Sequence, residues 1–554
     1  MKKFIRSPYF LFLCSFLIRT PTFNFHFLNI DELTNGIFAS FILDHQLNLK
    51  DFLGNTYLLT HYLYVLVYFI FGKNNLLAIH VMNALWNAST SLVLYFCGKK
   101  LTNSHRGGLF AGYYHAFFSI AFFAKDFQSA LSEGFSLLPA SLAFLFFLGF
   151  IKNKSSKSLF FSGLFIGVSC LFKSPSGIII VPLILAIIFY SEKPLGHSLI
   201  ALLGLILTLS VPYLIQGDFY HSIKDGFYQI RGINKGYIQA YSEIPFTYWL
   251  IKYLIRTLLI FMAMLPVTYL AFRSVKIYFK DRISIPNYES IAHIYLFLWL
   301  LSMWFVVTLG KRIFYHYFIF IIPPLCLMAA ITIGAKKISV KNILKSKTLF
   351  LVHLVGLASI IAFFSDGVLR WSVSHQTFPA AINYIKTYSK PHQPIFVWGL
   401  LPQIYYLSSR KPASTMIWAD SLAGFSPGTP AMEYMRITGK KLTIPEEVLK
   451  DLAPYKENIS KNDPITKNRI SFLNENELLT INEVLSRIDN PLWQKLFSDF
   501  FKTPPVIFID TSTHGARGFS SYPLAHYELL KKFIIDNYHF IGIYDGLSFY
   551  QLNS

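Results

Sequence analysis

The chain has 554 residues, of which 53% are hydrophobic and only 14% are charged, and its formal net charge is +21. Soluble domains carry about 25% charged residues, so the composition excludes an ordinary soluble protein and indicates a polytopic membrane protein. A basic excess can indicate nucleic-acid binding. Here, however, the basic residues form short clusters between apolar segments, where they orient helices in a lipid bilayer. The composition therefore predicts membrane lipids, and no nucleic acid, as partners.

Eleven apolar runs approach the roughly 20 residues that a helix needs to cross a bilayer. Basic residues precede the first run and no small-residue cleavage pattern follows it, so we expect an uncleaved first helix with a cytoplasmic N-terminus. From that start, the basic loops between later runs all fall on the cytoplasmic side, as the positive-inside rule requires. The runs lie near residues 4–20, 76–97, 107–124, 134–151, 158–174, 176–190, 197–215, 247–272, 291–309, 313–333 and 348–365.

A further apolar stretch, residues 57–71, must stay on the outer side if the basic loops are to keep this orientation. We therefore predict a long extracytoplasmic loop over residues 21–75, with an amphipathic helix followed by a membrane-embedded or interfacial segment. Such backbone is tolerated at membrane depth where it lines a protein cavity. A second large outer loop is predicted at residues 216–246, and the transmembrane core is expected to occupy residues 1–365.

From about residue 366 onward the composition is that of a soluble domain, which eleven spans would place outside the membrane. Short apolar runs between turn residues predict strands, and a longer run predicts a helix. The predicted fold is a polytopic α-helical membrane protein of about eleven transmembrane helices, with a soluble extracytoplasmic α/β domain at residues 366–554. In that domain we predict strands at 393–398 and 504–509, a helix at 524–537, and a strand pair at 540–551 with a turn at Asp545-Gly546.

Asp31 and Glu32 stand side by side directly after the first apolar run. Carboxylates at a membrane edge are costly unless they are solvated or partnered, so this pair is a candidate catalytic site. An aspartate with an ordinary pKa of about 3.9 is ionised at neutral pH and can accept a proton. The alternative is that Asp31 only caps the amphipathic helix expected at residues 33–43, by accepting a backbone N–H. The pair alone leaves both interpretations open.

A cationic and aromatic run, Gly310-Lys-Arg-Ile-Phe-Tyr-His-Tyr317, begins the tenth predicted span. In a helix it places Arg312 and His316 on one face, with Tyr315 and Tyr317 beside it. The planar fork of arginine suits phosphate oxygens, and histidine and tyrosine add further donors. Alternatively, the two cations reach lipid head groups and the tyrosines join the interfacial aromatic belt. Because the positive-inside rule leaves this side poor in cations, the run favours a site for a specific anion.

Two further charged residues lie at predicted outer ends of spans. Lys173 follows the fifth apolar run and either contacts the same anion or extends to the membrane surface. Glu133 begins the fourth span and either completes an acidic site with Asp31 or favours the helix start through the helix dipole. Paired carboxylates would suit Mg²⁺ or Mn²⁺, but the sequence does not establish a metal.

In their order along the chain, these motifs resemble the C-type, polyprenyl-phosphate-dependent glycosyltransferases, specifically the family-39 group of protein-mannosyltransferase-like and aminoarabinose-transferase-like enzymes. The resemblance covers most of residues 1–365. It implies a transmembrane core, a catalytic carboxylate at Asp31 and a lipid-linked sugar donor. The motifs that carry it are Asp31-Glu32, Ser132-Glu133, the stretch from Gly163 through Gly167 to Lys173, residues 310–317, and the tail segments 397–405 and 409–412, which are similar to the soluble domain of some members.

The chain departs from the family pattern at two positions. Many relatives carry a Lys-Pro-Pro stretch where this chain has Thr56, Tyr57 and Leu58, and an arginine common at the start of the second span is His80 here. Both changes affect residues that the family uses near the donor phosphate.

We therefore predict a glycosyltransferase of the bacterial inner membrane. It would take a sugar from a polyprenyl-phosphate donor on the extracytoplasmic leaflet and transfer it to an envelope glycolipid, polysaccharide or protein. The alternatives are a secondary transporter or flippase of a lipid-linked or small anionic substrate, although no symmetry between halves is visible, and a non-catalytic assembly subunit. The predicted roles are a general base for Asp31 with inversion at the sugar, an acidic site shaped by Glu32 and Glu133, and a phosphate clamp of Arg312, His316, Lys311, Tyr315 and Lys173.

Overall fold

The computed structural model describes residues 7–25, 27–45, 58–120, 128–216, 245–280, 287–308, 314–335, 343, 345–372, 377–423 and 491–553. The chain divides into two compact units. Unit 1 comprises residues 1–227 and 250–373, and unit 2 comprises residues 228–249 and 374–554.

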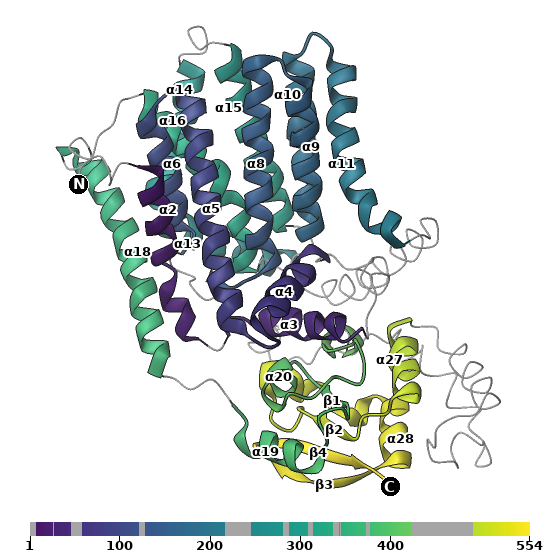
Figure 1. Ribbon diagram of the computed structural model, residues 1–554. Coiled ribbons are helices and arrows are strands. Elements are labelled where there is room, and N and C mark those ends of the chain that lie inside the picture. Colours follow the sequence, from purple (N-terminus) through teal and green to yellow (C-terminus); the bar gives the residue numbers. More distant parts are fainter. Residues whose placement is uncertain are drawn as a thin grey trace. The chain divides into compact units, whose positions relative to one another are not determined.

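Unit 1 is helical wherever it has regular structure in the described residues (Figure 1). Its helices, with short 3₁₀ segments labelled η, are α2 (Pro8–Leu17), η1 (Thr20–Asn24), α3 (Ile30–Leu43), α4 (Leu58–Phe71), α5 (Leu76–Thr102), α6 (His105–Phe118), α8 (Ser132–Asn153), α9 (Ser156–Phe172), η3 (Ser174–Ile179), α10 (Ile180–Tyr190), α11 (Pro194–Gln216), α13 (Phe246–Ala263), α14 (Leu265–Lys280), α15 (Asn287–Thr308), η5 (Tyr315–Ile321), α16 (Ile322–Ala335) and α18 (Lys347–Ser372).

The long helices α5, α8, α9 and α11 run side by side in chain order (Figure 1), and each contacts the next. Glycine lets two of their backbones touch. A Cβ added at Gly163 of α9 would lie 1.8 Å from the carbonyl oxygen of Ala201, and one at Gly204 of α11 would lie 2.2 Å from that of Phe160. Small residues at helix crossings are how membrane helices approach closely, because lipid supplies no hydrophobic force between them.

Among the described residues, six helices are long and apolar enough to cross a membrane. The outer face of α11 exposes large apolar side chains such as Leu199, Leu203 and Leu214, as expected for contact with lipid. The structure therefore shows a mostly helical protein with about six candidate spans, where the sequence predicts eleven. The six are Leu76–Thr102, Ser132–Asn153, Pro194–Ile215, Phe246–Ala263, Glu289–Thr308 and Tyr315–Gly334.

One predicted span is divided in the structure. The apolar run at residues 247–272 forms two helices, because α13 ends at Ala263 and α14 begins at Leu265. Pro266 has no N–H to continue the helical hydrogen-bond ladder across this point. The carbonyl of Met264 accepts both the backbone N–H of Thr268, at 3.0 Å, and its hydroxyl, at 2.9 Å.

Unit 2 contains a four-stranded sheet in the order β1-β2-β4-β3. Strands β1 (Ile395–Trp398) and β2 (Ile507–Asp510) are parallel, whereas β3 (Tyr538–Tyr544) and β4 (Leu547–Leu552) pair antiparallel to their neighbours. The predictions of these strands are confirmed. The predicted helix at 524–537 begins later, as α28 (Glu528–Asn537), after a short 3₁₀ turn, η7 (Leu524–His526). The other helices are α19 (Pro379–Tyr388), α20 (Pro402–Ser408), α21 (Asp420–Ala423), α27 (Pro491–Lys502) and η6 (Ala516–Ser521).

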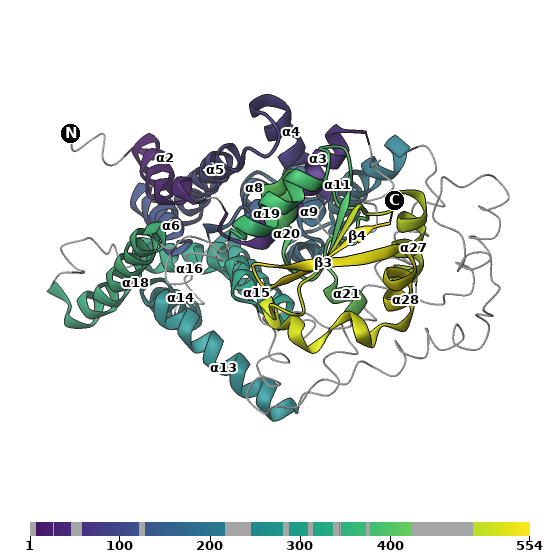
Figure 2. The ribbon, with the colours of Figure 1, turned by 90° about the horizontal axis from the view of Figure 1, so that it is seen from below.

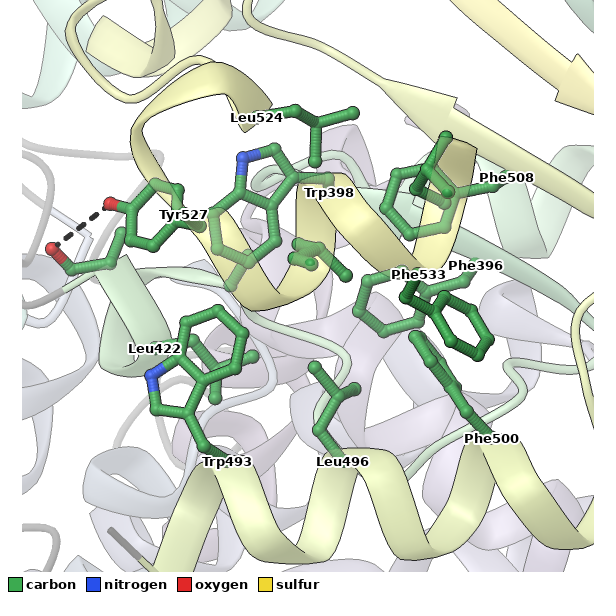
Figure 3. Close-up of a cluster of buried hydrophobic side chains, with 14 of the residues drawn as sticks. Phe396, Trp398, Leu422, Trp493, Leu496, Phe500, Phe508, Leu524, Tyr527 and Phe533 are labelled. Carbon is green, nitrogen blue, oxygen red and sulfur yellow. Dashed lines mark hydrogen bonds between the residues drawn. The ribbon is translucent and has the colours of Figure 1, made fainter. Parts of the chain in front are cut away.

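The aromatic core of unit 2 lies between the sheet and the helices α27 and α28, which lie together beside the sheet (Figure 2). Alternation along a strand sends Phe396, Trp398 and Phe508 to this face. They pack against Trp493 of α27 and Phe533 of α28 (Figure 3). Aromatic side chains supply much of the buried area in such a core, which stabilises the unit.

Candidate functional site

Helix α3 places Asp31 in its first turn and leaves capping to another residue. The N-cap is Asn29, whose side-chain oxygen accepts the backbone N–H of Asp31 at 3.1 Å, and the helix begins at Ile30. The alternative prediction, that Asp31 is the N-cap of a helix beginning near Leu33, is therefore wrong. Asn29 and Glu32 form a capping box, in which the side chains of the N-cap and N3 residues satisfy backbone N–H groups at the helix start.

Glu32 points away from solvent and is fully buried. Its Oε2 accepts the backbone N–H groups of Leu28 at 2.7 Å and Asn29 at 3.4 Å, and lies 3.4 Å from Nε2 of His80. Burial alone would raise the pKa of Glu32. His80 and the amides of Leu28 and Ala130 outweigh burial and hold that pKa below its ordinary value. Oε2 of Glu32 is thus already hydrogen-bonded to the residues just before α3, and it also contacts His80.

The second oxygen of Glu32 connects α3 to the segment that precedes α8. Oε1 accepts the backbone N–H of Ala130 at 2.6 Å. The hydroxyl of Tyr64, on α4, donates to the carbonyl of the same Ala130 at 2.8 Å. Both polar groups of this residue are therefore held by side chains from α3 and α4. Helix α8 begins two residues later, with Glu133 in its first turn.

Glu133 lies in a compact charged cluster with two predicted site residues. Its Oε1 is 2.7 Å from Nζ of Lys173 and 3.8 Å from Nε2 of His316. The side chains of Lys173 and Glu133 are only 7% and 4% exposed. Buried charges persist when they are paired and hydrogen-bonded. The structure therefore brings together Glu133, Lys173 and His316, which lie far apart in the sequence.

Lys173 is held at a break between two helices. It ends α9 in an extended conformation and precedes η3. The hydroxyl of Ser176 donates to the carbonyl of Lys173 at 2.8 Å, and Ser169 bonds both Ser176, at 2.8 Å, and the carbonyl of Ser136 on α8, at 3.0 Å. Because α8 also carries Glu133, the packing of α9 against α8 positions both partners of the ion pair.

His316 and its neighbours begin η5. The ring of His316 stacks on Phe314, with centroids 5.3 Å apart, and the ammonium of Lys173 lies 5.4 Å from the ring centroid of Tyr317. Residues 315–321 form a 3₁₀ helix. The predicted α-helical spacing therefore does not hold at His316, since a 3₁₀ helix has three residues per turn.

The guanidinium of Arg256, on α13, lies 4.9 Å from the ring centroid of Tyr315. No sequence motif marks this residue, because it is a single arginine within a long apolar run. Several predicted elements lie outside the described residues: Lys311 and Arg312, the substituted Thr56 and Tyr57, and nearly all of the second outer loop. In the described part of the chain, no three His, Cys, Asp or Glu side chains are placed to hold a metal ion.

Residues 57–215 match the family model described as dolichyl-phosphate-mannose-protein mannosyltransferase. No curated protein matches the chain. The crystal structure of ArnT from Cupriavidus metallidurans bound to undecaprenyl phosphate is similar to it at a TM-score of 0.52 and 12% identity, over 73% of this chain and 84% of that one. The predicted resemblance to the polyprenyl-phosphate-dependent glycosyltransferases is confirmed.

A second solved structure, the oligosaccharyltransferase of Archaeoglobus fulgidus in its apo form, matches at a TM-score of 0.50 and 12% identity, over 100% of this chain and 75% of that one. At such identity the likeness is one of fold, so the chain is related in fold to membrane glycosyltransferases. The segment that matches the family model contains Glu133 and Lys173, whereas Asp31 and His316 lie outside it.

Proposed function

We propose that this protein is an integral-membrane glycosyltransferase that transfers a sugar from a polyprenyl-phosphate donor to a cell-envelope acceptor, with inversion at the sugar. One observation carries the proposal. The first turn of α3, which presents Asp31, and the first turn of α8, which presents the Glu133–Lys173–His316 cluster, are linked through Ala130. A carboxylate and a cluster that carries the ammonium of Lys173, held on one linked frame, are the parts that a displacement at a phosphate-bound sugar needs.

In the proposed reaction, Asp31 accepts the proton of the acceptor hydroxyl as its oxygen attacks the anomeric carbon. The bond from that carbon to the phosphate oxygen breaks, and its electron pair leaves with the lipid phosphate. Lys173 and His316, joined by Lys311, Arg312 and Tyr315, stabilise the negative charge that develops on the leaving phosphate. A single displacement of this kind inverts the anomeric centre.

Glu133 has a supporting role in this proposal. Its carboxylate lies 2.7 Å from the ammonium of Lys173, and such pairing keeps a buried lysine charged and fixes its direction. Glu32 is already engaged by three backbone amides and supports the loop that presents Asp31. We therefore propose that Asp31 is the proton acceptor.

We further propose the predicted topology of eleven spans, with the N-terminus in the cytoplasm and unit 2 outside the bacterial inner membrane. Helix polarity within unit 1 supports this orientation. Helix α8 has Glu133 in its first turn and Lys152 in its last turn. Helix α9 has Lys157 as its second residue and is followed directly by Lys173. The lysines between the two helices thus lie at one end of the pair and the candidate site at the other. The acceptor would be selected by unit 2 and the second outer loop.

Glycan analysis of a strain that lacks this protein tests the proposal. Mass spectrometry should show a missing envelope glycan together with an accumulated polyprenyl-phosphate sugar, and this would identify both donor and acceptor. Wild type and Asp44→Asn should restore the glycan, whereas Asp31→Asn should not. Asp44 is a matched control, because it ends the same helix and pairs with Lys73. Unchanged glycans, or rescue by Asp31→Asn, would contradict the proposal.

A further inference from the structure

Residues 128–131, here called the hub segment, are held by side chains from several helices of unit 1. Two of these bonds, from Glu32 and Tyr64 to Ala130, belong to the site described above. A third comes from Asn83 of α5, whose Nδ2 donates to the carbonyl of Gln128 at 2.8 Å. The segment has its own backbone groups bonded from three helices, which is more than a simple connection before α8 requires.

The side chain of Gln128 adds a further link, to Arg19. Arg19 lies between α2 and η1 and is 1% exposed. Its Nη1 donates to Oε1 of Gln128 at 3.1 Å, and its Nη2 donates to the hydroxyl of Ser119, at the end of α6, at 2.7 Å. The amide of Gln128 closes the ring by donating to the carbonyl of Ser119 at 3.3 Å.

Arg19 is an unusual residue at this position, because its charged side chain is buried. A buried cation is expensive unless it is paired and hydrogen-bonded. Within the described residues, the hydrogen bonds of the Arg19 guanidinium go only to neutral groups of Gln128 and Ser119. Simple space filling does not need a guanidinium. The rigid fork of arginine can, however, fix two acceptors from different elements in one geometry, which a lysine cannot do.

We infer that Arg19 and Gln128 are positioning residues that fix the first turn of α8 relative to the first turn of α3. The inference rests on the proposed function. Gln128 is two residues before Ala130, which Glu32 binds, and five residues before Glu133. Anchoring the hub segment at Gln128 therefore sets the separation between the proposed base, Asp31, and the proposed phosphate cluster. Small misplacements of reacting groups lower rates strongly even when each group is intact.

The test uses the full chain in detergent, with Gln128→Met and Arg19→Lys as variants. Gln128→Met keeps the side chain's bulk and removes both amide bonds. Tyr95→Phe is the matched control, because it removes a partly buried side-chain hydrogen bond, to His105, at the opposite end of α5. Three quantities are measured: hydrogen exchange of the amides at residues 128–131, binding of undecaprenyl phosphate, and release of undecaprenyl phosphate from its mannose, glucose and aminoarabinose conjugates with an envelope extract as acceptor.

Gln128→Met and Arg19→Lys should lower kcat by about tenfold to a hundredfold, because Asp31 and the Glu133 cluster are no longer held at the separation that the reaction needs. Affinity for undecaprenyl phosphate should stay within about twofold, and amide exchange at the hub segment should rise by about tenfold. Tyr95→Phe should change none of the three. A merely structural role would lower the yield of folded protein and leave kcat per folded molecule unchanged, and that result would overturn the inference.

The activity of wild type separates failure of the inference from failure of the proposed function. If wild type binds undecaprenyl phosphate but releases none from any conjugate, the proposed function fails, and the role of these residues in the reaction fails with it. If wild type is active and Gln128→Met leaves both exchange and kcat at wild-type values, the inference fails while the proposed function stands.

Discussion

Glu32 and Glu133 occupy the same kind of position, the first turn of a helix, and both are buried. Their partners differ. Glu32 is bound by backbone amides of Leu28, Asn29 and Ala130, whereas Glu133 faces the ammonium of Lys173 and the imidazole of His316. The backbone amides that bind Glu32 are fixed in the fold. The ammonium of Lys173, in contrast, can bind the anion of a ligand as well as Glu133. We therefore propose that Glu32 has a structural role and that the residues around Glu133 take part in the reaction.

Among changes to the surroundings of these two glutamates, the largest effect should come from removing Lys173, the ammonium partner of Glu133. Lys173→Met should lower kcat by about 10²–10³, as loss of one preorganised donor to a developing anion does, in transfer assays with purified protein. The variant also leaves Glu133 buried without its lysine, which destabilises folding by about 3–5 kcal/mol. The double variant Lys173→Met/Glu133→Gln should therefore regain stability in thermal unfolding but not activity. Recovery of activity in the double variant would contradict the role given to Lys173.

Changing Glu32 should mainly affect stability. Glu32→Gln weakens hydrogen bonds to a charged acceptor, and such bonds contribute about 1.5–3 kcal/mol each. Thermal unfolding should show this loss. If Glu32→Gln folds as stably as wild type but loses transfer, Glu32 acts in the chemistry and the comparison fails.

Acidification should distinguish the two glutamates further. The pKa of folded Glu32 lies below its ordinary value, so its stabilisation is present above about pH 4.3, the unfolded value, and is lost as the pH falls through the folded pKa. Unfolding of wild type below about pH 4.3 should therefore be steeper in pH than unfolding of Glu32→Gln. Equal slopes for the two proteins would show that the Glu32 carboxylate does not carry this stabilisation.

The smallest effect concerns the cap of α3. Asn29→Ala removes the side-chain oxygen that caps the helix, and loss of such a cap typically costs about 1 kcal/mol. Asp31→Ala should destabilise the protein less than Asn29→Ala in the same thermal unfolding measurement, since Asp31 is not the cap. The reverse order would restore the capping interpretation of Asp31.

Parts of the fold and of the candidate site were predictable from local sequence. The side-by-side carboxylates, the helix that follows them and the strands of unit 2 all have short-range signals. The spacing of Asn29 and Glu32 is also that of a capping box, and this signal could have identified the true cap. The apolar runs predicted helices, and Pro266 is the sequence signal for the break before Leu265.

The partnerships could not be predicted. Glu133 and Lys173 were each recognised as candidates, but their pairing depends on how α8 packs against α9. The link from Glu32 to Ala130 joins residues that are 98 positions apart in the chain, and no periodicity reports such a contact. His80 stands where the family resemblance implies an arginine, and it lies beside Glu32, a pairing that no sequence pattern indicates.

The most direct test of the central claim is transfer by purified protein in liposomes that contain undecaprenyl-phosphate sugars and an envelope extract. Wild type and Asp44→Asn should transfer sugar, whereas Asp31→Asn should be slower by about 10²–10⁴, as loss of a general base predicts, while still binding undecaprenyl phosphate. Transfer by Asp31→Asn at the wild-type rate would contradict the account.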